Sequence, residues 1–423
     1  MAQGNRRGAF VRTFGSAIIV QGLLSATNLI VGLILIRRTS NTEYGYFVLV
    51  STTSLLLAGL QGAFIQPPLV IRMSRATQAQ RADLVGGVYR GQRRILACVS
   101  VAAAALVATL TLVGVLGPHL GLIAFTAVVS LTAALYREFF RTVLLSYRLS
   151  FDVLKADVCY GAIVLLGVPL ATLSPVPAAG AILAIGLAAA IGGVLLSRSL
   201  WRHEAWNPHG PVSMLREMAP LGTWSALGSA THWAFSQGYN YVVAGTMEVS
   251  AVAGLAATRL LLMPVNLLSA GITSLMMATS SAWLNTHGPS KLFRRLLLIA
   301  SGLGALALCY FVLVWALRDL ILARVMHKQF AQSGVLVALW SAVFLVMLFR
   351  DQLNFLPGAS GLHRRLMGVT SIAAIISLAV GYAAIRRYGA VGAPFGVLVG
   401  ELCNLAGIVY VSVIEIRRHR RAS

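Results

Sequence analysis

The stretch from Gly121 to Tyr147, GLIAFTAVVSLTAALYREFFRTVLLSY, is long and apolar enough to cross a bilayer as one helix. Its second half nevertheless contains Arg137, Glu138 and Arg141. A charged side chain at the centre of a transmembrane helix costs about 2.5–3.5 kcal/mol on an insertion scale, so such residues face a bundle interior or a water-filled cavity. The stretch therefore predicts a bundle of membrane helices with charged groups turned inward.

The same arrangement recurs 213 residues later, where Arg350 and Asp351 lie inside the apolar run LVALWSAVFLVMLFRDQLNFLPGAS. Two other matches have nearly the same offset. Gly45 corresponds to Gly254 at an offset of 209, and the glycine- and alanine-rich runs that begin at residues 178 and 390 correspond at 212. Three anchors at nearly one spacing indicate that the chain is an internal repeat of two halves.

Composition places this repeat in a membrane, because 58% of the 423 residues are hydrophobic and only 11% are charged. Hydropathy predicts twelve spans, at about 14–36, 44–71, 95–116, 121–147, 157–173, 178–200, 217–245, 251–284, 293–317, 335–360, 367–385 and 390–414. The polar segment WRHEAWNPHGPVSMLR, about 201–216, separates the sixth span from the seventh. We predict an all-α polytopic membrane protein with an N-terminal lobe (1–208) and a C-terminal lobe (209–423). These two pseudo-symmetric six-helix lobes are expected to surround a central cavity.

Small residues recur at every fourth position in the last span of each half. They are Gly180, Ala184, Ala188 and Gly192 in the first half, and Gly392, Gly396 and Gly400 in the second. Such a stripe lets two helix backbones approach closely, so we interpret it as a packing surface.

Four arginines fall inside the predicted spans, namely Arg137, Arg141, Arg259 and Arg350, with Glu138 and Asp351 as their charge partners in sequence. Arg137 and Arg141 are four residues apart and share a helix face, where Glu138 cannot neutralise both. At about 6 Å and an effective dielectric of about 20, the two guanidiniums would repel by roughly 3 kcal/mol. They either bind an anion such as a diphosphate or belong to an internal network that holds helices together.

Polar side chains form a stripe along the first span of each half. The expected cavity-lining residues are Gln21, Ser25 and Asn28 in span 1 and Ser229, His232, Ser236 and Asn240 in span 7. His232 is either a buried hydrogen-bonded imidazole or a proton carrier. Glu401 in span 12 is either a coupling carboxylate or a hydrogen-bond partner.

The sequence predicts no enzyme, metal site or cofactor, because it contains no metal-ligand spacing, no Walker A loop and no GxSxG motif. The four cysteines lie far apart in apolar runs. The net charge of +22 comes mostly from short loops between spans, which argues for anionic lipid headgroups rather than nucleic acid as the partner.

Three segments resemble those of a known family, namely RTSNTEYGYF from Arg38, LARVMHKQFAQSGVLVALW from Leu322 and YGAVGAPFGVLVGE from Tyr388. With them the chain resembles the polysaccharide exporters, or lipid-linked oligosaccharide (O-antigen) flippases, of the multidrug/oligosaccharidyl-lipid/polysaccharide exporter superfamily. The resemblance implies alternating access in the bacterial inner membrane and a substrate of undecaprenyl-diphosphate carrying a short glycan. That substrate is used for exopolysaccharide or O-antigen synthesis. The resemblance also implies a polysaccharide polymerase and a chain-length regulator as partners beside membrane lipids.

Two alternatives remain. A cation-coupled multidrug exporter of the same superfamily would be expected to carry an acidic residue in span 1, which has none here. A membrane glycan polymerase or ligase would be expected to carry a long polar outer loop. The longest predicted outer loop runs only from about residue 318 to 334.

Charge bias predicts the topology. With both termini in the cytoplasm, 23 of the 34 lysines and arginines fall in cytoplasmic segments, seven in outer loops and four within spans. We therefore expect a reporter that is active only in the cytoplasm to function when fused within 201–216, and a periplasmic reporter at the same point to be inactive. The opposite result would overturn the two-lobe interpretation.

Overall fold

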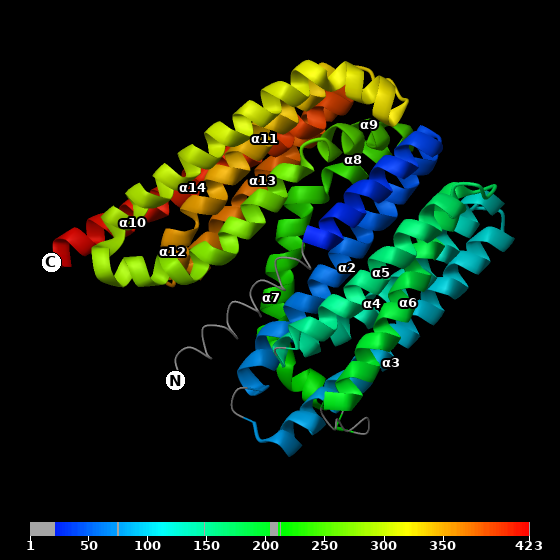
Figure 1. Ribbon diagram of the computed structural model, residues 1–423, viewed down its shortest axis with the longest axis horizontal. Helices are drawn as coiled ribbons and strands as arrows, with labels where there is room; N and C mark the ends of the chain where they lie inside the picture. Colours follow the sequence, from blue (N-terminus) through cyan, green and yellow to red (C-terminus); the bar gives the residue numbers. More distant parts are fainter. Residues whose placement is uncertain (1–21, 74–75, 148, 204–209, 212, 423) are drawn as a thin grey trace. The chain divides into compact units, whose positions relative to one another are not determined.

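The computed structural model describes residues 22–73, 76–147, 149–203, 210–211 and 213–422, and these are helical almost throughout (Figure 1). Residues 22–38 are helical, followed by α2 (Asn41–Met73), α3 (Gln78–Leu112), α4 (Pro118–Ser146), α5 (Ser150–Ala171) and α6 (Pro177–His203). The second half contains α7 (Ser213–Gln237), α8 (Tyr239–Thr246), α9 (Val249–Leu260), α10 (Met263–Ile321), α11 (Ser333–Leu353), α12 (Phe355–Ala359), α13 (His363–Tyr388) and α14 (Gly392–Ala422).

The helices follow the order of the twelve predicted spans, although several spans of the second half are interrupted. Span 7 comprises α7 and α8, span 10 comprises α11 and α12, and span 8 comprises α9 with the start of α10. The 59-residue α10 continues into span 9 but is kinked at Gly288, whose φ of 74° and ψ of 169° are not helical. Proline follows at 289 and has no N–H to continue the helical hydrogen bonds.

Two helices begin well before the apolar runs that predicted them. α3 begins at Gln78 rather than near 95, behind Thr77, which forms a capping box with Gln80. α5 begins at Ser150 rather than near 157. Hydropathy detects only the part of a helix that resembles hydrocarbon, whereas these first turns contain polar residues and are held by the capping box in α3 and by the buried Ser150 and Val153 in α5. The longer α5 places Asp157 inside a helix.

Large apolar side chains remain exposed along the long helices, as expected for surfaces that face lipid. On α3, Leu112 is 87% exposed and Val101 is 69% exposed. Eight of the described helices or helix runs are long and apolar enough to cross a membrane. The chain is a multi-pass membrane protein.

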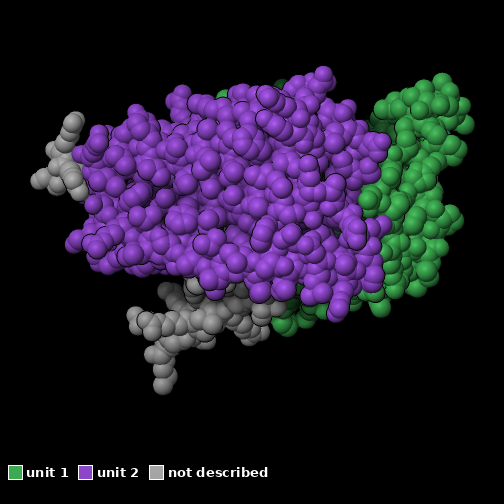
Figure 2. Space-filling view, turned by 90° about the horizontal axis from the view of Figure 1, so that it is seen from above, with its two compact units in different colours: residues 1–230 green, residues 231–423 purple. Residues whose placement is uncertain are grey.

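The chain divides into two compact units, an N-terminal unit of residues 1–230 and a C-terminal unit of residues 231–423 (Figure 2). The division falls inside α7, so the first part of this helix belongs to the first unit and its last turns to the second. The lobe boundary at 208/209 stays a prediction. Much of its linker, residues 204–209 and 212, lies outside the described residues.

In the N-terminal unit, α4 packs against α2, α3, α5 and α6 (Figure 1). Phe139 and Phe140 of α4 are almost completely buried and contact the ring of Tyr89 from α3. This aromatic cluster lies next to Arg137 and Glu138 in sequence. The charged residues of α4 therefore lie on a helix that packs against four others.

Glu43 holds one end of the same unit. It lies in the first turn of α2 and accepts a 2.7 Å hydrogen bond from the backbone N–H of Ala178, in the first turn of α6. Its other oxygen pairs with His119 Nε2 of α4 at 2.6 Å. A carboxylate is favoured at a helix N-terminus, where N–H groups lack partners and carry partial positive charge. The segment RTSNTEYGYF thus joins the beginnings of three helices.

In the C-terminal unit, α13 and α14 pack face to face through the predicted stripe of small residues. A Cβ atom built on Gly396 would overlap the backbone of Gly381 on α13, and one on Gly392 would overlap the backbone at Ala384. In the other unit, a Cβ on Gly186 would come within 2.8 Å of the Ser130 backbone of α4. These glycines are needed for the close approach of the helices.

We expect Gly396→Leu to wedge α14 away from α13 and to reduce the amount of folded protein in the membrane severely, because backbone atoms cannot yield to the new side chain. Gly368→Leu on α13 is the matched control, since no atom lies within 4 Å of a Cβ at that position. Size-exclusion chromatography of fluorescent fusions measures both. Wild-type abundance of the Gly396 variant would show that the close contact is not required.

Candidate functional site

The intramembrane arginines of α4 belong to a four-residue charge cluster that includes Asp157 of α5. Arg137 Nη2 donates to Asp157 Oδ1, and Arg141 Nε donates to Asp157 Oδ2 at 3.3 Å. Arg141 Nη1 also donates to Glu138 at 3.2 Å. Asp157 has no exposed surface, and the Arg137 side chain is 10% exposed. Two guanidiniums and two carboxylates therefore neutralise one another inside the unit.

Arg137 is also held by packing. Its guanidinium carbon lies 3.9 Å from the centre of the Tyr160 ring, about one turn beyond Asp157 on α5. A Cβ on Gly192 of α6 would come within 3.1 Å of the Arg137 side chain. The last glycine of the small-residue stripe thus leaves room for the arginine, and the cluster joins α4, α5 and α6.

The C-terminal unit contains a different cluster around Arg350 of α11. Arg350 Nη1 donates to both carboxylate oxygens of Glu401 on α14, at 2.7 Å each. Its Nε and Nη2 donate to Asp351 Oδ1 at 2.9 and 2.6 Å. Glu401 is buried, with 1% of its side chain exposed, whereas the Asp351 side chain is 38% exposed. This cluster has one cation and two carboxylates.

Arg259 near the end of α9 has another environment. Its Nη1 donates to Tyr239 Oη at 2.8 Å, Gln237 Oε1 at 3.1 Å and the Ser236 carbonyl at 3.3 Å. Its guanidinium carbon lies 5.3 Å from the centre of the Trp340 ring, which contacts the Tyr239 ring. Among the described residues, no carboxylate forms an ion pair with Arg259 and no hydrogen bond uses its Nε or Nη2.

Arg259 also lies where two spans are interrupted. Span 7 breaks between Gln237 and Tyr239, and Arg259 binds the Ser236 carbonyl at this break. Span 8 breaks at residues 261–262, where Tyr310 donates to the Leu261 carbonyl at 2.7 Å. Interrupted helices are tolerated at membrane depth where side chains satisfy the freed backbone groups, and in transporters they often form binding sites.

The predicted cavity-lining residues belong to both units, with Ser25, Asn28 and Ser229 in the N-terminal unit and His232, Ser236 and Asn240 in the C-terminal unit. Ser25 is half-buried and Asn28 is only partly covered, while Gln21 lies outside the described residues. In α7, Ser229 faces Gly59 of α2 and His232 is exposed. Ser236 donates to the Trp233 carbonyl at 3.4 Å, and the buried Asn240 donates to Gln237. Of this set, Ser236 and Asn240 lie at the break beside Arg259.

Sequence reasoning missed Asp157, Tyr160, Tyr239 and Trp340. The predicted span 5 begins at Asp157, so this residue was placed at the membrane surface and not considered as a partner that neutralises Arg137 and Arg141. The expectation of an unbalanced arginine pair is therefore wrong. An acidic residue at the start of an apolar run, one span after two arginines, is the signal that could have found it. The aromatic residues give no signal, because aromatic residues are common in membrane helices.

No family model and no curated protein matches the chain. Solved structures do resemble it. An inward-facing multidrug resistance MATE family transporter of the MOP superfamily aligns with a TM-score of 0.76 and 13% identity, over 94% of this chain and 95% of that one. The lipid II flippase MurJ in an inward closed conformation aligns with a TM-score of 0.73 and 10% identity, over 93% of this chain and 86% of that one. The predicted fold class, an all-α polytopic protein of two six-helix lobes, is confirmed.

The Arg350 cluster yields a stability prediction. Arg350→Ala leaves the buried Glu401 without a cation, and breaking a buried ion pair costs about 3–5 kcal/mol. We expect a large loss of folded protein. Arg350→Gln combined with Glu401→Gln should restore most of it, because two amides can hydrogen-bond without charge. Thermal unfolding and abundance in membranes test both variants. If the single variant is as stable as wild type, the ion pair does not hold α11 to α14.

Proposed function

We propose that the protein is a flippase that moves undecaprenyl-diphosphate-linked oligosaccharide across the bacterial inner membrane, for exopolysaccharide or O-antigen synthesis. It would work by alternating access with both termini in the cytoplasm. The proposal is supported by the three sequence segments that resemble polysaccharide exporters and by the fold shared with a lipid II flippase. It rests above all on the environment of Arg259.

Arg259 is the intramembrane arginine best suited to hold a diphosphate. Arg137, Arg141 and Arg350 are each hydrogen-bonded to carboxylates. Within the described part of the chain, Arg259 bonds only neutral acceptors, and these use Nη1 alone. The remaining Nε and Nη2 form the edge of the guanidinium that binds two phosphate oxygens at once. In this proposal Arg259 contacts the substrate, and the other three arginines hold the helices that position it.

The glycan would be bound less specifically than the diphosphate. Sugar hydroxyls require hydrogen-bond donors and acceptors, and the half-buried Ser236 near Arg259 can supply one of each in the C-terminal unit. Membrane lipids surround the exposed apolar faces. A polysaccharide polymerase and a chain-length regulator are the proposed partners, because they would act on the product of the flipping step.

Coupling would use the extra carboxylate of the C-terminal unit. Glu401 is bound at both oxygens by Arg350, so its role in this proposal is structural. Asp351 is partly exposed and binds only one edge of Arg350. It is the better candidate to bind a proton or cation that drives transport, and His232 of α7 is the second candidate.

The same carboxylate favours a second candidate function, a cation-coupled multidrug exporter. An exposed Asp351 beside a neutral Arg350–Glu401 pair would attract an organic cation, and several of the similar structures are MATE transporters. Substrate charge separates the two functions. An anionic lipid diphosphate requires Arg259, whereas a cationic drug requires Asp351 and is opposed by Arg259.

We expect Arg259→Ala to reduce export of the lipid-linked glycan by about ten- to a hundredfold when export is normalised to the amount of folded protein, which will itself fall because the Ser236 carbonyl loses its donor. A hydrogen bond to a charged group contributes about 1.5–3 kcal/mol, and no buried carboxylate is left unpaired by this change. Arg259→Lys should recover part of the export, since the charge remains but the planar fork is lost. Export is measured by surface glycan in cells that depend on this protein.

Arg364→Ala is the matched control, because it removes one positive charge from an exposed site in the same unit. It should leave export unchanged. Normal export with Arg259→Ala would refute the diphosphate site. If drug efflux instead depended on Asp351 while glycan export did not depend on Arg259, the multidrug function would be correct.

A further inference from the structure

Gln237 ends α7 and contacts Arg259 through the oxygen of its side-chain amide. This oxygen, Oε1, accepts a 3.1 Å hydrogen bond from Arg259 Nη1 and a 3.2 Å hydrogen bond from Asn240 Nδ2. The same Asn240 nitrogen donates to the Gln237 carbonyl at 3.2 Å. Two donors therefore fix the orientation of the amide, with its oxygen towards the guanidinium.

Arg259 carries a positive charge that no ion pair among the described residues cancels. Arg141 and Arg350 donate to carboxylate oxygens at 3.3 and 2.7 Å, whereas Arg259 donates to an amide, a hydroxyl and a main-chain carbonyl. Glu401 is close enough to Arg259 to interact electrostatically, but both of its oxygens accept hydrogen bonds from Arg350. Gln237 thus occupies the place that a carboxylate takes beside the other two arginines.

Neutral groups stabilise the charge of Arg259 without cancelling it. The C-terminus of α7, at Gln237, carries the partial negative charge of its last carbonyls, which favours a cation. The rings of Tyr239 and Trp340 are buried, and their centres lie 5.9 and 5.3 Å from the guanidinium carbon. An aromatic face attracts a cation at this distance. These contacts explain how the arginine is tolerated inside the unit without a carboxylate.

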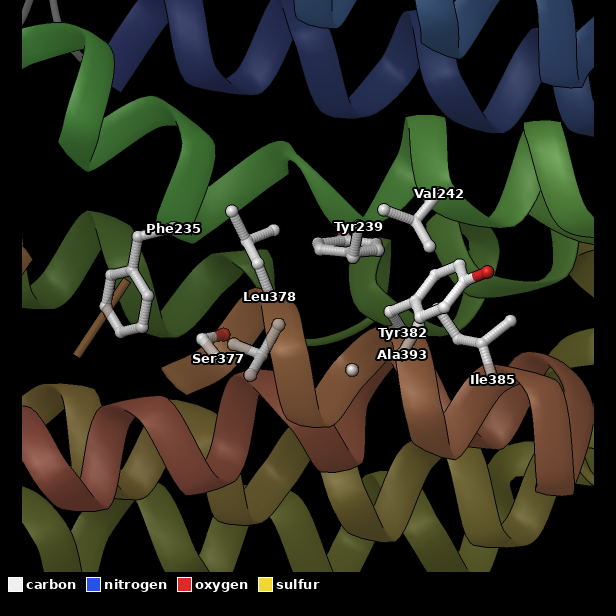
Figure 3. A pocket seen from close by; sticks show the side chains of 10 residues that line it. Phe235, Tyr239, Val242, Ser377, Leu378, Tyr382, Ile385 and Ala393 are labelled. Atoms are coloured by element: carbon white, nitrogen blue, oxygen red, sulfur yellow. The ribbon is translucent and has the colours of Figure 1, made fainter. Parts of the chain in front are cut away.

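Tyr239 is also held from its other side. Its ring lines a narrow apolar cleft together with Phe235, and with Leu378 and Tyr382 of α13 (Figure 3). The cleft has room for about one water molecule, which leaves the ring little space to shift. The Tyr239 hydroxyl that accepts from Arg259 Nη1 at 2.8 Å is therefore fixed in position. The guanidinium is consequently held in one place by groups that have no charge.

We infer that Gln237 sets the charge specificity of the substrate site, because its neutral amide positions Arg259 and leaves the positive charge for the diphosphate. Gln237 has this role only if Arg259 binds the diphosphate, so the inference rests on the proposed function. Gln237 is a positioning residue that acts through the arginine. A carboxylate of the same shape at this position would turn Arg259 into a paired arginine like Arg350, and the site would lose its preference for an anion.

The test uses purified full-length protein and two probes of opposite charge, farnesyl diphosphate and tetraphenylphosphonium. We expect Gln237→Glu to weaken the binding of farnesyl diphosphate at least about tenfold and not to weaken that of tetraphenylphosphonium. A general folding defect would weaken both. The new carboxylate can accept both hydrogen bonds that Gln237 Oε1 accepts, so the thermal unfolding midpoint should not fall. Calorimetry at constant detergent composition measures the affinities.

Gln237→Met separates the effect of charge from that of hydrogen bonding. Methionine has a similar length, no charge and only a weak acceptor. Arg259 Nη1 keeps its bonds to Tyr239 and Ser236, so the loss in affinity for farnesyl diphosphate should be about threefold. If Gln237 acted only as a hydrogen-bond acceptor, the order would be reversed. Gln237→Glu would then bind like wild type and Gln237→Met would bind more weakly, which overturns the inference.

Gln329→Glu is the matched control, because it makes the same exchange at an exposed position in a loop of the same unit. It should bind both probes as wild type does, and a tenfold loss there would show that any added negative charge weakens binding, which overturns the role of Gln237. If Gln237→Glu does not fold, a loss above about tenfold in Gln237→Met overturns it. If wild type does not bind farnesyl diphosphate, or Arg259→Ala binds it like wild type, the diphosphate site itself fails.

Discussion

The pairing of buried arginines with carboxylates is the interaction on which this structure depends. A guanidinium cannot give up its proton at any physiological pH, so burying it as fully as Arg137 and Arg350 are buried requires a partner that carries the opposite charge. Asp157 supplies that charge for two arginines, and Glu401 supplies it for Arg350. Each carboxylate lies on a helix other than that of its arginine. Removing a partner would leave an uncompensated buried charge. The helices must therefore pack so that each arginine reaches its carboxylate, α4 against α5 and α11 against α14.

The two halves satisfy this condition in different ways, although Arg137 and Arg350 occupy matching positions. The carboxylate of the first half comes from the fifth span, and that of the second half comes from the twelfth. In the first half, the Arg137 side chain also needs space beside α6, and Gly192 provides it because it has no side chain. The second half has an additional, partly exposed carboxylate at Asp351. The matching helices of the two halves therefore each carry an arginine at the same position, but the carboxylates that pair with it come from different helices. Only the cluster of the second half has more carboxylates than arginines.

Hydropathy, charge bias and the repeat predicted the fold class and the order of the spans, because these depend on properties that each segment carries alone. The small-residue stripes were predicted for the same reason, and Gly396 lies against Gly381 as the stripe requires. The site was predicted less well. Arg259 and Arg350 were identified as costly intramembrane charges, but pairings such as Arg137–Asp157 depend on which helix faces meet. The break at Gly238 was missed because the polar residues around it were interpreted as a cavity-lining stripe. The break at residues 261–262 lies just before Pro264, and both breaks are stabilised by side chains that bind the freed carbonyls.

Arg259 illustrates how a helix break can position a side chain to which the proposed function assigns substrate binding. A helix interruption leaves carbonyls without their usual N–H donors, and at membrane depth each of them must be satisfied by a side chain. Arg259 meets this requirement at Ser236 with one nitrogen, and the contacts with Gln237, Tyr239 and Trp340 fix the plane of its guanidinium. The side-chain entropy that an anion would otherwise have to overcome has then already been lost during folding. One arginine therefore both satisfies the backbone break and presents Nε and Nη2, so the interrupted helix also positions the two donors that the proposed function assigns to the diphosphate.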